Sequence, residues 1–199
     1  YEAYWKNLEA GKYDIPSGFT ADEYAKHLKA LGKVDNQLAL SKVEYDEVLK
    51  LRKEIASKLK SDEIIVKQKL ANKIAQEYNA KYNPVNRAKT KGYEGIGKTI
   101  NGGATFEGTK YMYQVEKGQL NKVIIKAQGN RNADFKLANN KAGLDSKPDD
   151  TVWHHLDDYN VQTNEITLEL VYIDAHKATV PHAGGCAQYD AVNGSSYNK

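Results

Sequence analysis

The feature that most constrains the fold is a change of sequence pattern near Tyr82-Asn83-Pro84. Before this point, apolar residues recur at helical spacing. After it, glycine, asparagine and threonine become frequent, and helical periodicity is absent through Gly118. Proline and glycine mark turns and the boundaries between elements. The pattern therefore predicts a helical segment at residues 1–83 and a domain of short strands and helices at residues 84–199, an α+β fold.

Start signals divide the helical segment into three predicted helices. A capping box places Ser or Thr at the N-cap and Glu three residues later. The three starts are Thr20 with Glu23, Ser41 with Glu44, and Ser61-Asp62-Glu63. The last helix carries an apolar stripe that we expect to pack against another helix rather than to form a binding groove. The stripe consists of Val66, Leu70, Ile74 and Tyr78.

The second part alternates strand and helix signals. Residues 122–127 predict a strand, and residues 134–141 predict a short helix that ends at Gly143. Residues 151–156 and 166–172 predict two strands of a hairpin joined by a polar turn. A further helix is expected near Asp174, where Pro181 limits its length.

Composition excludes several classes of protein. The chain has 199 residues, of which 40% are apolar, and can form a core without disulfides. Cys186 is the single cysteine, so neither an internal disulfide nor a CxxC zinc site is available. No apolar run is long enough to span a membrane. Because the chain begins with Tyr1 and not Met, we expect it to be a fragment of a longer protein.

Charge is unevenly distributed along the second part. Residues 84–144 contain 11 Lys and Arg against 4 Asp and Glu, whereas residues 145–199 contain 3 and 9. A basic segment favours phosphate binding, and acidic clusters can hold metal ions. The alternative is that two oppositely charged segments pack against each other.

A phosphate-loop pattern, G-x-x-x-x-G-K-[ST], occurs at residues 92–99. Such a loop binds phosphate only between a buried strand and the start of a helix. Polar residues precede this segment, and Ile100-Asn-Gly-Gly103 follows it. We therefore expect a basic loop and not a nucleotide triphosphatase.

Four of the five histidines lie within the last 46 residues, at positions 154, 155, 176 and 182. Imidazole is a common ligand for divalent metals, which need several donors from different elements. Because adjacent strand residues face opposite ways, His154 and His155 are expected to divide two roles, metal ligand and base. The alternative is a set of hydrogen-bonded or exposed structural histidines.

The sequence also resembles the WHH group of the HNH/endonuclease VII nucleases. The resemblance covers roughly residues 100–186 and includes Gly129-Asn-Arg131 through Leu144, then Pro148, Trp153-His154-His155, Asp174, His176 and His182-Ala-Gly184-Gly185. It departs from the group at Tyr172, in its long turn, and in the spacing of six between His176 and His182, where Pro181 is expected to keep His182 off the helix.

This resemblance implies a ββα-metal (His-Me) finger that binds one divalent ion, with Mg²⁺ or Zn²⁺ expected and Mn²⁺ or Ni²⁺ open. It implies that His154, His176 and His182, the last a possible third, are metal ligands, and that His155 is the general base. A reversed assignment, with Trp153 at the ligand position and His154 as the base, stays open. In the first assignment, Trp153 is expected to pack against the hairpin, and either Asn160 or Asn164 is expected to fix its turn.

The same resemblance implies the substrate and the biological setting. Arg131, Lys126 and Lys136 are expected to bind the nucleic-acid backbone. The expected function is a metal-dependent endonuclease that cuts DNA. The alternatives are an RNA-cleaving version of this fold and an inactive, metal-stabilised binding module. Such domains form the C-terminal parts of secreted bacterial toxins, including contact-dependent growth inhibition toxins. They act in the target cell's cytoplasm and have a dedicated immunity protein, with residues 1–83 as a linker or a module for cell entry.

Overall fold

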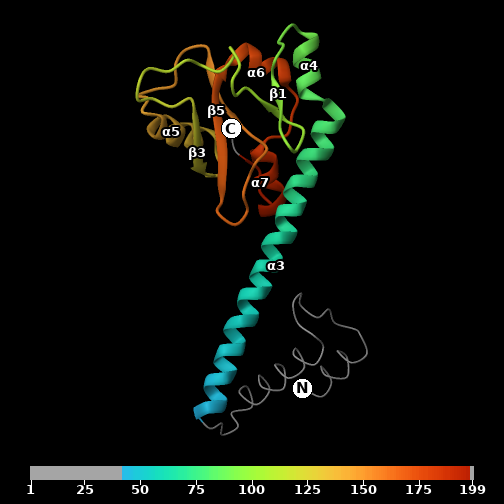
Figure 1. Cartoon of the computed structure of the whole chain (residues 1–199), viewed down its shortest axis with the longest axis vertical. Helices are drawn as coiled ribbons and strands as arrows, with labels where there is room; N and C mark the ends of the chain where they lie inside the picture. The colour runs from blue at the N-terminus through green and yellow to red at the C-terminus, as the bar shows by residue number, and fades with distance from the viewer. Residues whose placement is uncertain (1–41, 198–199) are drawn as a thin grey trace. The chain divides into compact units, whose positions relative to one another are not determined.

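The structure is a computed structural model that describes residues 42–197 (Figure 1). The predicted helix after Thr20 and the Ser41 side chain lie outside the described residues. The chain divides into two compact units, residues 1–65 and 66–199. The second unit thus begins before the predicted boundary at residue 84, and it contains every predicted site residue.

Helix α3 (Lys42–Tyr82) is one continuous element, so the predicted new start at Ser61 is wrong. Ser61 is exposed and Asp62 is half-buried. Polar side chains that face water at such positions do not interrupt a helix. The buried face of α3 carries Ala71, Ala75 and Asn79.

The predicted apolar stripe of α3 does not form a core among the described residues. Val66 is 65% exposed, and Leu70, Ile74 and Tyr78 are also exposed. The small side chains of Ala71 and Ala75 are fully buried instead. The small alanine side chains allow this part of α3 to pack closely against the rest of the second unit. Helical spacing therefore identified an apolar face of the helix but not the face that packs.

A three-stranded antiparallel sheet forms the centre of the second unit. It contains β3 (Lys122–Lys126), β4 (Thr151–His155) and β5 (Glu165–Tyr172), in the order β3-β5-β4. The predicted strand at residue 122 and the predicted hairpin are thus confirmed. The register pairs His154 with Glu169 and His155 with Leu168. Adjacent β4 residues therefore face opposite sides of the sheet.

Helix α5 (Arg131–Ala142) packs on one face of the sheet (Figure 1). The side chain of Asn130 caps its start, and Gly143, with φ of 71°, ends it as predicted. The core on this face includes Val123, Ala138, Trp153, Ile166 and Leu168. Trp153 is 1% exposed, and its Nε1 donates a hydrogen bond to Asn139 Oδ1 at 2.8 Å.

The other face is covered by α4 (Pro84–Thr90), α6 (Ile173–Thr179) and a two-stranded sheet of β1 (Gly97–Lys98) and β2 (Ala104–Thr105). Its core contains Phe106, Val171 and Ala175. In the phosphate-loop pattern, turns lead into β1 and no helix follows. This segment therefore lacks the strand-to-helix arrangement in which a phosphate loop binds phosphate.

Helix α7 (Gly185–Asn193) was not predicted. Its N-cap residue, Gly184, approaches the end of β4 so closely that only glycine fits, which hid the helix start from the sequence pattern. A Cβ at Gly184 would lie 2.5 Å from the His155 carbonyl oxygen.

Both candidate asparagines stabilise the turn between β4 and β5. Asn160 Oδ1 accepts a hydrogen bond from the Thr163 N–H at 3.0 Å. Asn164, with φ of 56°, donates from Nδ2 to the Ala127 carbonyl at 3.1 Å and so joins the turn to the end of β3. Within the described residues, no helix combines the length and apolarity needed to cross a membrane.

Candidate metal and nuclease site

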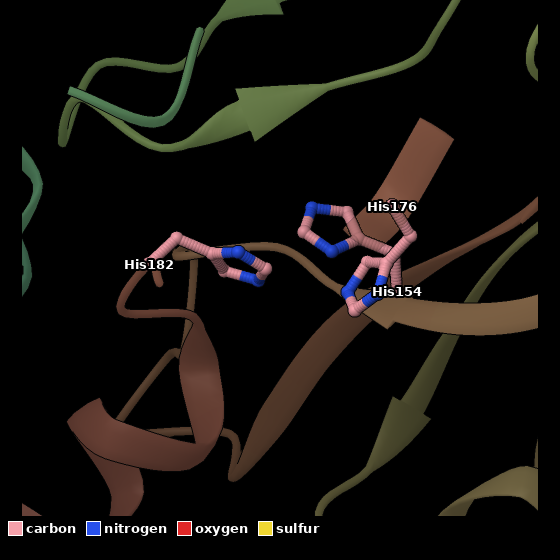
Figure 2. Close-up of side chains that lie close together, drawn as sticks. All are labelled: His154, His176 and His182. Carbon is pink, nitrogen blue, oxygen red and sulfur yellow. The ribbon is translucent and has the colours of Figure 1, made fainter. Parts of the chain in front are cut away.

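Three histidines from different elements come together and form what we call the histidine cluster. His154 lies on β4, His176 on α6, and His182 in the loop before α7, and their rings converge (Figure 2). One ring nitrogen from each lies within 4.8 Å of the others. Ring centroids are 4.9 Å apart for His154 and His182, and 5.1 Å for the other two pairs.

The surroundings of His154 fix its tautomer. Its Nε2 lies 2.9 Å from the Ala104 carbonyl oxygen, which can only accept, so Nε2 carries the proton. Its Nδ1 is buried and has no hydrogen-bond partner in the described part of the chain. An unpaired buried acceptor is unfavourable unless another group satisfies it. Metal-bound histidines commonly donate their other N–H to a carbonyl in this way.

Burial keeps the histidine cluster neutral. Desolvation, followed by repulsion from His182, lowers the pKa of His176 to about 3. Desolvation also lowers the pKa of His182 to about 4. The pKa of His154 is lowered well below its usual value, mainly by burial and then by the neighbouring histidines. Neutral imidazole is the form that binds a metal.

The residues of the histidine cluster fit a divalent metal ion. Three protein ligands that leave one position free are typical of catalytic zinc sites. In a tetrahedral site with Zn–N distances of about 2.0–2.1 Å, ligand nitrogens lie about 3.3 Å apart, so modest ring movements suffice. The donor set consists of nitrogen alone, which suits Zn²⁺, Ni²⁺ and similar ions better than Mg²⁺, an ion that prefers oxygen.

The break after α6 places His182. The helix ends at Thr179, as expected from Pro181, so His182 enters the cluster from a loop and not from the helix that carries His176. Thr179 Oγ1 lies 3.3 Å from His182 Nδ1, which leaves Nε2 as the more open nitrogen. The unusual spacing of six residues is therefore compatible with both histidines reaching one site.

His155 occupies a different environment from His154. Its Nε2 lies 2.8 Å from Oδ2 of Asp134 on α5, and it is 8% exposed. Its ring also lies beside that of Phe135. The two adjacent histidines thus face different partners, as the strand geometry predicts.

His155 and the histidine cluster nevertheless share one cavity. Its volume is about 330 Å³, and its lining includes Arg131, Phe135, His155, His176, His182 and Cys186. Burial raises the pKa of the Cys186 thiol to about 12. The thiol is therefore protonated at neutral pH and is not a competing anionic ligand.

The predicted nucleic-acid residues separate into two groups. Arg131 lines the cavity, whereas Lys126 and Lys136 are exposed and do not line it. Lys126 Nζ lies 3.1 Å from a carboxylate oxygen of Glu165. This exposed ion pair joins the basic segment to the acidic one between paired residues of β3 and β5.

Trp153 does not belong to the histidine cluster. Its side chain is buried on the α5 face, opposite to that of His154. The reversed assignment, with Trp153 at the ligand position, does not agree with this placement.

Two residues near His155 were missed by the sequence reasoning. Asp134 was part of the resemblance but received no role, although an acidic residue in the first turn of a predicted helix was a visible signal. Tyr197 Oη donates to Asp134 Oδ2 at 2.5 Å, yet it follows α7 and belongs to no pattern. No sequence signal could have associated it with the site.

A comparison with protein families supports the nature of this site. Residues 144–191 match the family described as WHH, a nuclease of the HNH/ENDO VII superfamily with conserved WHH. No curated protein and no solved structure gives a match. The matched segment spans β4, β5 and α6 and includes His154, His155, His176 and His182. Residues 144–191 are thus similar to the WHH nucleases of the HNH/ENDO VII superfamily.

Proposed function

We propose that the protein is a metal-dependent endonuclease that hydrolyses phosphodiester bonds, with DNA as its substrate. The observation that carries this proposal is one cavity with two kinds of histidine. His176 and His182 enter it from the histidine cluster, and His155 faces it with a carboxylate behind its ring. Metal-assisted phosphodiester hydrolysis needs ligands that hold a metal ion and, beside them, a base that accepts the proton of the attacking water.

His154, His176 and His182 would hold a single divalent ion, and we favour Zn²⁺ or Ni²⁺ over Mg²⁺ because the donors are all nitrogen. When bound, such an ion supplies Lewis-acid neutralisation of charge on the phosphate and leaving oxygen. His154 donates its Nε2 proton to the Ala104 carbonyl, which leaves the lone pair on its buried, unpartnered Nδ1 for a metal ion.

His155 takes the proton of the attacking water. Its Nε2 is engaged by Asp134, so Nδ1 is the nitrogen left to accept a proton. A positioned base of this kind typically contributes about 10²- to 10⁴-fold to the rate. Arg131 supplies a fixed positive charge in the same cavity and can hold a phosphate oxygen. Contacts of this type do not read bases, so we expect cleavage with little sequence preference.

The choice of substrate is tested by incubating supercoiled plasmid and a structured RNA with the protein. Each is incubated with Zn²⁺, Ni²⁺, Mn²⁺ or Mg²⁺, with and without EDTA. We expect metal-dependent nicking of the plasmid that EDTA abolishes. Cleavage of RNA alone would favour the RNA-cleaving alternative. Nucleic-acid binding without cleavage under any metal would favour an inactive binding module.

The toxin setting is also a proposal, and it rests on the resemblance. We propose that the chain is the nuclease part of a secreted bacterial toxin, acts in the cytoplasm of the target cell, and is neutralised by an immunity protein. The test is inducible expression in bacteria, with His155→Ala as the matched control. Growth arrest and DNA loss are expected for the wild type only. Unimpaired growth at high expression of the active enzyme would contradict the toxin role.

A further inference from the structure

The carboxylate of Asp134 organises a buried network behind His155. Asp134 is 0% exposed. Its Oδ1 accepts a hydrogen bond from the backbone N–H of Gln128 at 3.0 Å. Its Oδ2 receives two partners, the Tyr197 hydroxyl at 2.5 Å and His155 Nε2 at 2.8 Å. Each oxygen of the carboxylate thus has a defined partner, which fixes its rotation.

We propose that Asp134 and Tyr197 are positioning residues that hold His155 in the tautomer protonated at Nε2. This role rests on the proposed nuclease function, in which His155 Nδ1 accepts a proton. An ionised carboxylate can only accept hydrogen bonds, so the imidazole nitrogen that faces it carries the hydrogen. The other nitrogen, Nδ1, then keeps its lone pair. Neither residue contacts the phosphate, and both act through the His155 ring.

Tyr197 closes the network from beyond α7. It is 6% exposed, and its ring packs against those of His155 and Tyr189. Burial and the nearby carboxylate raise the pKa of its hydroxyl, which therefore stays a donor. The hydroxyl donates to Oδ2, and a carboxylate oxygen has enough lone pairs to accept from both Tyr197 and His155. Residues after α7 are thus required to complete the support of the base.

Substitution of Asp134 by Asn gives a defined structural outcome. The Gln128 N–H needs an acceptor, so the amide oxygen of the new asparagine should occupy the position of Oδ1. The amide NH₂ then faces His155 Nε2, which must become an acceptor. The proton of His155 moves to Nδ1, and the lone pair that would accept the water proton is lost. The volume of the side chain is unchanged, so packing should be retained.

The tautomer of His155 can be measured directly by ¹⁵N NMR of the full chain with EDTA present, without reference to activity. We expect protonated Nε2 in the wild type and protonated Nδ1 in Asp134→Asn. In cleavage assays, Asp134→Asn should lose about 10²-fold or more in kcat. Its KM for DNA and its zinc affinity should be unchanged, because no ligand or phosphate contact is altered.

Tyr197→Phe serves as a second, milder variant if Asp134→Asn is unstable. It removes one hydrogen bond and should lower kcat about fivefold to tenfold, with KM unchanged. Tyr189→Phe is the matched control, because it retains its ring contact with Tyr197, and it should cut as the wild type does. Retention of the Nε2 proton and of full turnover in both Asp134→Asn and Tyr197→Phe would overturn the positioning role. A wild-type chain that binds zinc but cuts no nucleic acid contradicts the nuclease proposal instead. The His155 tautomer measured by NMR still tests the positioning role of Asp134 and Tyr197 in that case.

Discussion

Asn79 near the end of α3 donates a hydrogen bond from Nδ2 to Oδ2 of Asp157, in the loop after β4, at 3.0 Å. The same side chain binds Ala183 twice, since Nδ2 donates to its carbonyl at 3.0 Å and Oδ1 accepts its N–H at 2.8 Å. Ala183 follows His182 directly. Asn79 is 1% exposed, so these are buried contacts. The end of α3 thus fixes the loop that supplies one of the cluster histidines.

This arrangement predicts different behaviour for two truncated chains. A fragment of residues 66–199 retains Asn79 and should fold, bind zinc and cut as the full chain does. A fragment of residues 84–199 leaves the Ala183 N–H and other buried groups without partners, at about 1–3 kcal/mol each. It should be less stable and bind zinc more weakly. Thermal unfolding and zinc titration of both fragments check this, and equal behaviour would show that the sequence-based boundary at residue 84 is sufficient.

The packing at Gly184 gives a second prediction. An added Cβ would lie 2.5 Å from the backbone oxygen of His155, and a backbone atom cannot move aside easily. Gly184→Ala should therefore displace the loop that carries His182 and reduce zinc affinity and stability together. Gly194→Ala is an informative control, because nothing lies near its Cβ, although its φ of 60° carries a strain of its own. A Gly184→Ala variant with normal zinc affinity would contradict this account.

The elements around the site were predictable, because hairpin and helix signals are local. Strand alternation predicted β5, and Gly143 predicted the end of α5. The buried face of α3 was not predictable, since tertiary packing selected Ala71 and Ala75 over the more apolar stripe. The histidine cluster was expected from composition and resemblance, but the Asp134–Tyr197 contact joins residues 63 positions apart. Only the folded chain shows such a contact.

The low pKa values of His176 and His182 predict the pH dependence of metal-free stability. Both are neutral in the folded chain down to about pH 4, with pKa values of about 3 and about 4. In the unfolded chain they take up protons below a pKa of about 6.5. The unfolded state then binds more protons, so stability present above pH 6.5 is lost as the pH falls toward 4.

The measurement is urea unfolding in EDTA between pH 8 and pH 4, for the wild type and for His176→Asn. The free energy of unfolding should decline below pH 6.5 more steeply in the wild type, because the variant lacks one of the shifted groups. Identical pH dependence in the two proteins would show that His176 is not held neutral by burial.

Arg131 and Lys126 should differ in their effect on cleavage. Arg131 lines the cavity, whereas Lys126 is exposed and pairs with Glu165. Arg131→Ala should lower kcat/KM about tenfold or more, since it removes the proposed charge-assisted contact to phosphate. Lys126→Ala should change kcat/KM less than threefold, because exposed ion pairs contribute little. Assays at one fixed salt concentration test this, and a larger loss for Lys126→Ala would place the nucleic acid elsewhere on the surface.

The central claim is that His154 belongs to the metal-binding cluster while its neighbour His155 acts as the base. Calorimetric zinc titration together with single-turnover plasmid cleavage of His154→Ala and His155→Ala tests it most directly. We predict that His154→Ala loses zinc affinity and activity together and is partly rescued by excess zinc. His155→Ala should keep its zinc affinity, lose about 10²-fold or more in turnover, and gain nothing from added zinc. The account would be contradicted if His155→Ala lost zinc affinity while His154→Ala kept it. It would also be contradicted if both variants cut plasmid at the wild-type rate.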